Sequence, residues 1–186
     1  MKAMTISIRM MSRTEPVSIQ TDLAYIAAQA DLKFSENENF RDFLRNRDFD
    51  LDTMVPALNA VIEAQVDCTQ CGNCCRSLMI NVTPAEATQL ADRLGQPLEM
   101  VKKTFLEESS GGQLVINAIP CHFLDNNKCS IYADRFTDCR AFPNLDKPGF
   151  SQRIFATLMH YGRCPIIYNV MEELKLQTTF IAAPKA

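Results

Sequence analysis

Four of the chain's eight cysteines fall between Cys68 and Cys75, in the order Cys-x2-Cys-Gly-x-Cys-Cys. A spacing of three residues lets successive thiolates turn toward one metal centre, and Gly72 gives the backbone the freedom for a tight bend. The same spacing occurs in ferredoxin-type iron–sulfur sequences and in zinc knuckles. Small thiols buried in an ordinary core are the alternative, but clustering at this spacing favours metal binding. The expected ligands in this group are Cys68, Cys71, Cys74 and Cys75.

The other four cysteines are spread along the second half of the chain: Cys121, Cys129, Cys139 and Cys164. Their spacing is not diagnostic, but their contexts are informative. Cys164 precedes Pro165, as the last ligand of bacterial ferredoxins precedes a proline, and a helix start there favours the thiolate. We expect all eight cysteines to be metal ligands, in one site or two. The alternative is that one or two of the distal four are plain core residues.

Three arginines stand next to cysteines in the sequence, namely Arg76, Arg140 and Arg163. A thiolate-bound cluster is anionic, so we expect these guanidinium groups to lie close to the cofactor and offset its charge. A surface position is the alternative for each of them. The two histidines of the chain, His122 and His160, are further candidates for ligands or for hydrogen-bond donors to the ligands.

Charge and composition exclude several classes of protein. The chain has 186 residues, a net charge of −3 and 22% charged residues, which is typical of a globular protein and gives no basic surface for nucleic acid. No run of about 18 apolar residues predicts a membrane span. The first nine residues lack the apolar stretch of a secretory signal. We therefore expect a soluble cytoplasmic protein, in whose reducing compartment cysteines bind metal and do not form disulfides.

The local sequence predicts a mostly helical chain. Two helices are expected between residues 17 and 49, and a third is expected after a cap at Asp50 or Asp52, with Pro56 in its first turn. Thr83-Pro84-Ala85-Glu86 predicts a capping box and a helix to Leu94. Another helix is expected after Pro97 and a last one from Pro165. Residues 113–119 predict a strand, and residues 121–132 predict a hairpin that brings Cys121 near Cys129.

These elements predict an α+β fold, mostly α-helical, with a small β-hairpin or sheet around a cysteine-rich metal site. Residues 1–15 are expected to form a loose leader. Residues 1–60 are expected to be an N-terminal helical extension packed on the core, and residues 61–186 to be the cysteine cluster metal-binding domain. The amphipathic helices of the extension would also suit an unidentified protein partner; neither nucleic acid nor membrane is expected as a partner.

The order of these motifs resembles the YkgJ-type cysteine cluster family, the CxxCxxCC proteins, over residues 68–165. The resemblance implies chelation of zinc or iron. A related cysteine arrangement occurs in flagellin lysine methylases, which carry an iron–sulfur cluster, and this favours iron. One departure is Phe136-Thr137, where the family often has a proline after the arginine. The matching motifs are Cys68-x2-Cys71-Gly72-x-Cys74-Cys75, Pro120-Cys121-x-Phe123-Leu124, Cys129-x-Ile131-Tyr132, Arg135-x3-Cys139-Arg140-x-Phe142-Pro143 and Cys164-Pro165.

The predicted function is a metal-binding protein that holds an iron–sulfur cluster, of the 4Fe–4S type, through the CxxCxxCC motif and the distal cysteines. Two alternatives stay open: a structural zinc protein, and an iron–sulfur-dependent enzyme related to the flagellin lysine methylases. No nucleotide-binding loop, Gly-x-Ser-x-Gly elbow or HExxH motif occurs, so no catalytic residue is assigned.

Overall fold

The computed structural model describes residues 18–182, so the expected leader at residues 1–15 lies outside the described part of the chain. The chain divides into two compact units. We call Met1–Val66 with Asp146–Ala186 the helical unit, and Asp67–Leu145 the cysteine unit. Within residues 18–182, no helix has both the length and the apolar character needed to cross a membrane.

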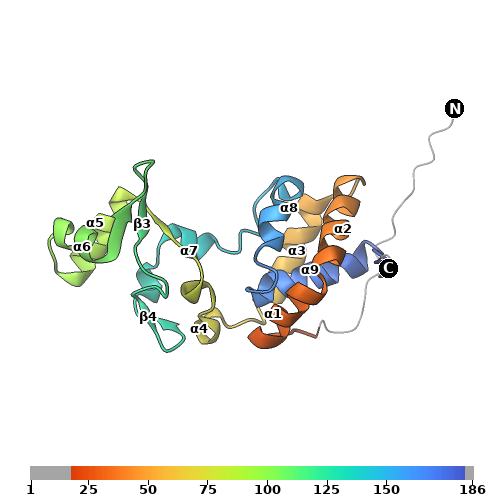
Figure 1. The fold of residues 1–186 in the computed structure, drawn as a ribbon, viewed down its shortest axis with the longest axis horizontal. Coiled ribbons are helices and arrows are strands. Elements are labelled where there is room, and N and C mark those ends of the chain that lie inside the picture. The colour runs from red at the N-terminus through yellow and green to blue at the C-terminus, as the bar shows by residue number, and fades with distance from the viewer. Residues whose placement is uncertain (1–17, 183–186) are drawn as a thin grey trace. The chain divides into compact units, whose positions relative to one another are not determined.

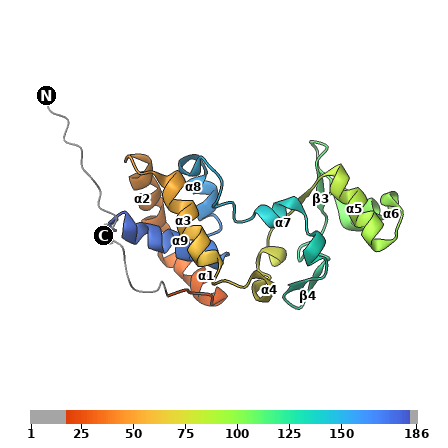
Figure 2. The same ribbon diagram turned by 180° about the vertical axis from the view of Figure 1, so that it is seen from behind.

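The helical unit is a bundle in which α9 packs against α3 and α1, and α8 packs against α2 and α3 (Figures 1 and 2). Its apolar core includes Ile26, Val55, Ile154 and Met171, all at most 1% exposed. Burial of such side chains is the main stabilising term for a bundle of this kind. The helices are α1 (Leu23–Leu32), α2 (Phe34–Arg45), α3 (Leu51–Glu63), α8 (Phe150–Leu158) and α9 (Pro165–Gln177).

Two aspartates organise the start of α3. The Asp50 side chain caps the helix by accepting a hydrogen bond from the Thr53 amide. The Asp52 carboxylate instead accepts the amides of Gly149 and Phe150, each at 2.8 Å, and thereby ties the start of α8 to α3. Pro56 was expected in the first turn, but it is the sixth residue of α3. There its missing N–H leaves the Asp52 carbonyl without its usual helical partner.

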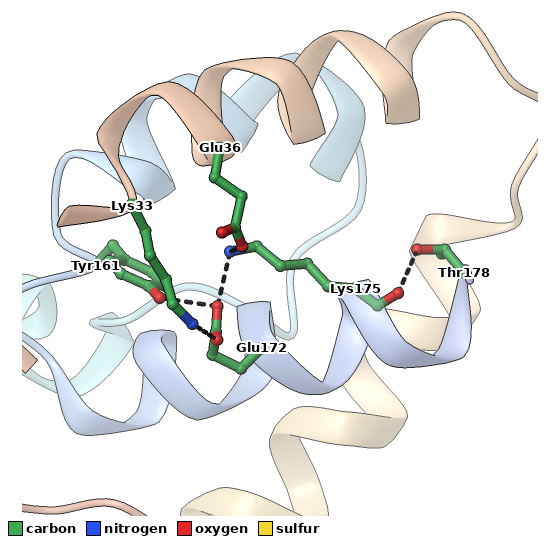
Figure 3. A network of polar contacts seen from close by, with 6 residues as sticks. All are labelled: Lys33, Glu36, Tyr161, Glu172, Lys175 and Thr178. Carbon is green, nitrogen blue, oxygen red and sulfur yellow. Dashed lines mark hydrogen bonds and ion pairs between the residues drawn. The ribbon is translucent and has the colours of Figure 1, made fainter. Parts of the chain in front are cut away.

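A buried ion network joins α2 and α9 of the helical unit (Figure 3). The Lys175 ammonium lies 2.7 Å from carboxylate oxygens of both Glu36 and Glu172, and only 7% of its side chain is exposed. The hydroxyl of Tyr161 donates to Glu172 at 2.8 Å, and Lys33 forms an ion pair with the same carboxylate. Burial alone would raise the pKa of Glu172, but the hydrogen bonds from Lys175 and Lys33 lower it below the usual value. The carboxylate therefore stays ionised inside the bundle.

The cysteine unit is built from shorter elements. Strands β1, β3 and β2 form an antiparallel sheet in that order, and β4 pairs with β5 in the predicted hairpin. The helices α5 and α6 pack against each other, and α6 also contacts β2 (Figure 1). The elements are α4 (Cys68–Cys71), η1 (Cys74–Arg76), β1 (Asn81–Val82), α5 (Pro84–Leu94), α6 (Leu98–Phe105), β2 (Leu106–Glu108), β3 (Leu114–Ile116), β4 (Leu124–Asp125), β5 (Lys128–Cys129), η2 (Tyr132–Asp134) and α7 (Thr137–Ala141).

The predicted fold class is confirmed, since the chain is mostly helical with small antiparallel sheets. The predicted capping box is also present: the Glu86 amide donates to the Thr83 hydroxyl, and the Glu86 carboxylate accepts the Thr83 amide. The helix it starts ends at Leu94, before Gly95, as expected. The predicted strand over residues 113–119 is shorter in the structure, where β3 covers Leu114–Ile116.

The two units divide the chain differently from the predicted boundary at residue 60. Residues 146–182 group with the N-terminal helices, whereas the sequence-based division placed them with the cysteines. The reason is the burial of α9, whose Ile166 and Ile167 are at most 1% exposed in a bundle with α3 and α1. A helix with apolar residues on most of its surface needs several neighbouring helices, and the N-terminal helices provide them.

We expect Lys175→Met to destabilise the helical unit by about 3 kcal/mol, because it leaves two carboxylates without their shared cation. The matched control is Lys102→Met. The Lys102 ammonium lies 3.3 Å from Glu99 in a pair whose side chains are 38% and 83% exposed, so its loss should cost at most ~0.5 kcal/mol. Urea unfolding of both variants measures the difference. Equal effects of the two substitutions would show that the network adds no more than a surface ion pair.

Candidate metal centre

The first cysteine group is folded by its non-cysteine residues. The carboxylate of Asp67 accepts the Thr69 amide at 2.8 Å and the Thr69 hydroxyl at 2.6 Å, which fixes the start of α4. Gly72 then adopts φ +59°, and a Cβ at this position would lie 2.9 Å from the carbonyl oxygen of Asn127. Glycine is needed here both for the left-handed backbone and for the close approach of the β4–β5 turn.

The adjacent cysteines Cys74 and Cys75 lie in the 3₁₀ helix η1, and their sulfur atoms are 4.0 Å apart. Side chains of adjacent residues usually point in different directions. Here the two sulfurs lie close together, and each interacts electrostatically with Cys121 and Cys139. The backbone contributes to this approach, because the Cys121 amide donates to the Cys75 carbonyl at 2.8 Å.

Six cysteines of the cysteine unit form what we call the thiol network, in which each sulfur interacts electrostatically with at least one other. All six are free thiols with partly buried side chains. Within the network, four thiols interact in every pairwise combination, and we call them the inner four. The inner four are Cys74, Cys75, Cys121 and Cys139; Cys71 and Cys129 complete the network.

Cys68 and Cys164 are the other two of the eight predicted ligands. Cys68 is exposed at the start of α4, three residues before Cys71. Cys164 is buried in the helical unit, where it precedes α9 as its N-terminal cap residue. The predicted start of a helix at Pro165 is therefore confirmed. The assignment of Cys68 and Cys164 as ligands stays a prediction.

The surroundings of the thiol network disfavour more than one or two thiolates at a time. Burial, together with the neighbouring sulfurs of Cys121 and Cys74, raises the pKa of Cys139 to about 12. Burial likewise raises the pKa of Cys71 and of Cys121. A hydrogen bond from Cys75 lowers the pKa of Cys74 to about 6 and raises that of Cys75 far above its ordinary value. Several thiolates can coexist here only if a cation is added among them.

The chemistry of this donor set fits a thiophilic metal. Thiolate sulfur is the ligand that zinc and iron–sulfur clusters prefer in proteins, and the inner four supply four of them. Within residues 18–182, however, no group of three or more Cys, His, Asp or Glu side chains is arranged closely enough to hold a metal ion. Coordination therefore requires the sulfurs of the inner four to move closer together.

The arginines contribute in different ways. The Arg76 guanidinium donates to the Cys71 carbonyl at 3.1 Å and also bonds to Asn127, so it braces the first cysteine group. The Arg140 guanidinium donates to the carbonyls of Arg135 and Ala133, each at 2.8 Å. Arg163 lies in the helical unit, where its guanidinium is 3.0 Å from the His160 ring nitrogen Nδ1. Their expected role in offsetting the charge of a cofactor stays a prediction.

A fourth arginine, which the sequence analysis did not assign, interacts with the thiol network. The positive charge of Arg135 contributes to lowering the pKa of Cys74 and opposes the rise in the pKa of Cys139. The sequence held a signal for this residue, because Arg135 lies four residues before Cys139 in the matched motif. Arg135 is not adjacent to a cysteine, unlike the three arginines that were expected to offset the charge of a cofactor.

The histidines are engaged elsewhere. The His122 ring nitrogen Nε2 lies 2.6 Å from the Asn117 side chain, and the ring packs edge-on against Phe105. His160 belongs to the helical unit, where burial, together with the charge of Arg163, lowers its pKa.

A protein-family model matches residues 67–164, more than half of the chain, and its description is "CxxCxxCC: Putative zinc- or iron-chelating domain". The chain belongs to this family. Membership supports metal binding by the CxxCxxCC domain, with zinc or iron as the metal. The matched range contains all eight cysteines, including Cys164 of the helical unit. Neither the search of curated proteins nor the search of solved structures gave a significant match.

We expect Cys139→Ser to lose most of the bound metal, because it removes one of the inner four donors. The control is Met79→Ser, which removes an exposed sulfur just after η1 without removing a thiol. Metal per protein chain, measured by elemental analysis after purification without oxygen, compares the two. Full metal content in Cys139→Ser would contradict the assignment of Cys139 as one of the metal ligands.

We expect Arg135→Gln to weaken metal binding about fivefold, or ~1 kcal/mol, since it removes a positive charge that favours the thiolates. Arg140→Gln is the matched control, because that guanidinium donates to backbone carbonyls. Competition with a chelator of known affinity measures both variants. If Arg140→Gln has the larger effect, the arginine adjacent to the cysteine is the more important one, as the sequence analysis predicted.

Proposed function

We propose that this protein holds an iron–sulfur cluster, of the 4Fe–4S type, through thiolates of the cysteine unit. The observation that carries the proposal is the set of the inner four, whose sulfurs all interact with one another. A 4Fe–4S cluster takes four cysteine thiolates, which matches this number. The proposed ligands are Cys74, Cys75, Cys121 and Cys139.

Three features of the surroundings support a cluster. The donor set consists of sulfur alone, and both histidines have other partners. The sulfurs are partly buried, and exclusion of water stabilises a cluster and tunes its potential. A cluster with four thiolates carries net negative charge, and the guanidinium groups of Arg135 and Arg76 lie near the cysteines to offset it.

Zinc is the second candidate, and the distance between Cys74 and Cys75 favours it. Two thiolates on one tetrahedral zinc ion, each at 2.3 Å, have sulfurs ~3.8 Å apart. The observed separation of 4.0 Å is close to this value. In a 4Fe–4S cluster each iron takes its own cysteine, so neighbouring ligands stand farther apart. A zinc site here would stabilise the fold of the cysteine unit and carry out no redox chemistry.

Purification of the full chain without oxygen separates the two candidates. We expect a brown protein that absorbs broadly near ~400 nm and contains iron and acid-labile sulfide, because thiolate-bound iron–sulfur clusters are coloured. Cys121→Ser, which removes one of the proposed ligands, should lose this colour, and Met79→Ser should keep it. A colourless protein with one zinc per chain would instead establish the structural zinc site.

A further inference from the structure

The cysteine unit contains a pocket beside the thiol network that metal binding leaves unused. Its volume is about 590 Å³, within the ~300–1,000 Å³ range of small-molecule sites. Residues from α5, from η2 and its C-terminal cap, and from α7 line it. Arg135 links the pocket to the cysteines, because it lines the pocket and its charge also acts on Cys74 and Cys139.

Three arginines and two carboxylates line this pocket, which leaves one net positive charge. Three of the four carboxylate oxygens already have a partner. Glu86 accepts the amides of Thr83 and Thr137, and Asp134 forms an ion pair with Arg93. The walls therefore have few acceptors left for a ligand, while the guanidinium groups, with five N–H donors each, still have donors to offer.

Arg135 is the clearest of these donors. Its guanidinium stacks over the ring of Tyr132 at 4.2 Å and, within residues 18–182, has no hydrogen bond or ion pair. The backbone around it is held in place, because Arg140 bonds to the carbonyls of Arg135 and Ala133. A planar guanidinium fixed against an aromatic ring is already positioned for a bidentate bond to a carboxylate or a phosphate.

We propose that this pocket binds a small oxyanion, a phosphate ester or a carboxylate, with the Arg135 guanidinium as its main hydrogen-bond donor. The ligand occupies the space between α5 and α7, and the remaining donors of Arg93 and Arg140 add to the positive field. The pocket is distinct from the cysteine donor set, so the proposal does not depend on which metal the cysteines hold.

Isothermal titration calorimetry on the full chain at low ionic strength tests the proposal, because screening by salt weakens such binding. The probes are glycerol 3-phosphate and succinate, and glycerol is the uncharged control. We expect saturable binding of at least one anion and none of glycerol. Arg135→Gln should weaken the binding at least tenfold. Arg47→Gln should leave it unchanged, since Arg47 also lies over an aromatic ring, that of Phe43 at 4.6 Å, but outside the pocket.

A second variant keeps Arg135 in place. Gln89 is exposed on α5 and lines the pocket, so Gln89→Trp should fill the space and abolish anion binding. The metal content of each sample is measured in parallel. Anion binding by a protein that contains no metal would overturn the proposed function and leave the anion site in place. Absence of saturable binding for both anions in the wild type, or equal binding in Arg135→Gln, would overturn the anion site.

Discussion

The cysteine unit depends on the cost of placing negative charge on partly buried sulfur. As neutral thiols, Cys121, Cys129 and Cys139 are small, weakly polar groups that pack against an apolar core that includes Phe123 and Phe136. As thiolates they repel one another and lose hydration, which is why burial and neighbouring sulfurs raise the pKa of Cys139. The same side chains therefore have two stable roles, as part of a core or around a cation. The presence of a cation decides between these roles.

The scaffold around the cysteines is held by contacts that involve no sulfur. Gly72 permits the close approach of the β4–β5 turn, and the Asp138 carboxylate accepts both the amide and the side chain of Asn81. The Glu86 carboxylate accepts the Thr137 amide at 2.6 Å, which joins α5 to the start of α7. These bonds bring segments that are far apart in the sequence together around the inner four. The cysteines thus lie close enough to interact electrostatically without any sulfur–metal bond.

The sequence predicted those parts of this arrangement that local chemistry controls. Thr83, Pro84 and Glu86 specify a capping box through interactions within one turn, and Pro165 starts α9 for a similar local reason. The CxxCxxCC motif and the turn between β4 and β5 could also be predicted from the local sequence. The packing of segments that are distant in the sequence could not be predicted, because no local sequence feature specifies that α9 packs on α3. The spacing of Arg135 from Cys139 is local and could have been used, but its effect on Cys74 acts across segments that are distant in sequence.

The two units illustrate different solutions to stability, and this difference bears on the role of the metal. The helical unit buries long helices and satisfies its internal charges with one another, as Lys175 does with Glu36 and Glu172. The cysteine unit has strands of two or three residues and several helices of three to five residues, and such elements bury little apolar surface each. Small units of this kind usually need a covalent or metal cross-link. A metal held by Cys74, Cys75, Cys121 and Cys139 would link η1, the segment before β4, and α7. Zinc and an iron–sulfur cluster supply this cross-link equally well, so the need for a cross-link explains the cysteines but does not select the metal.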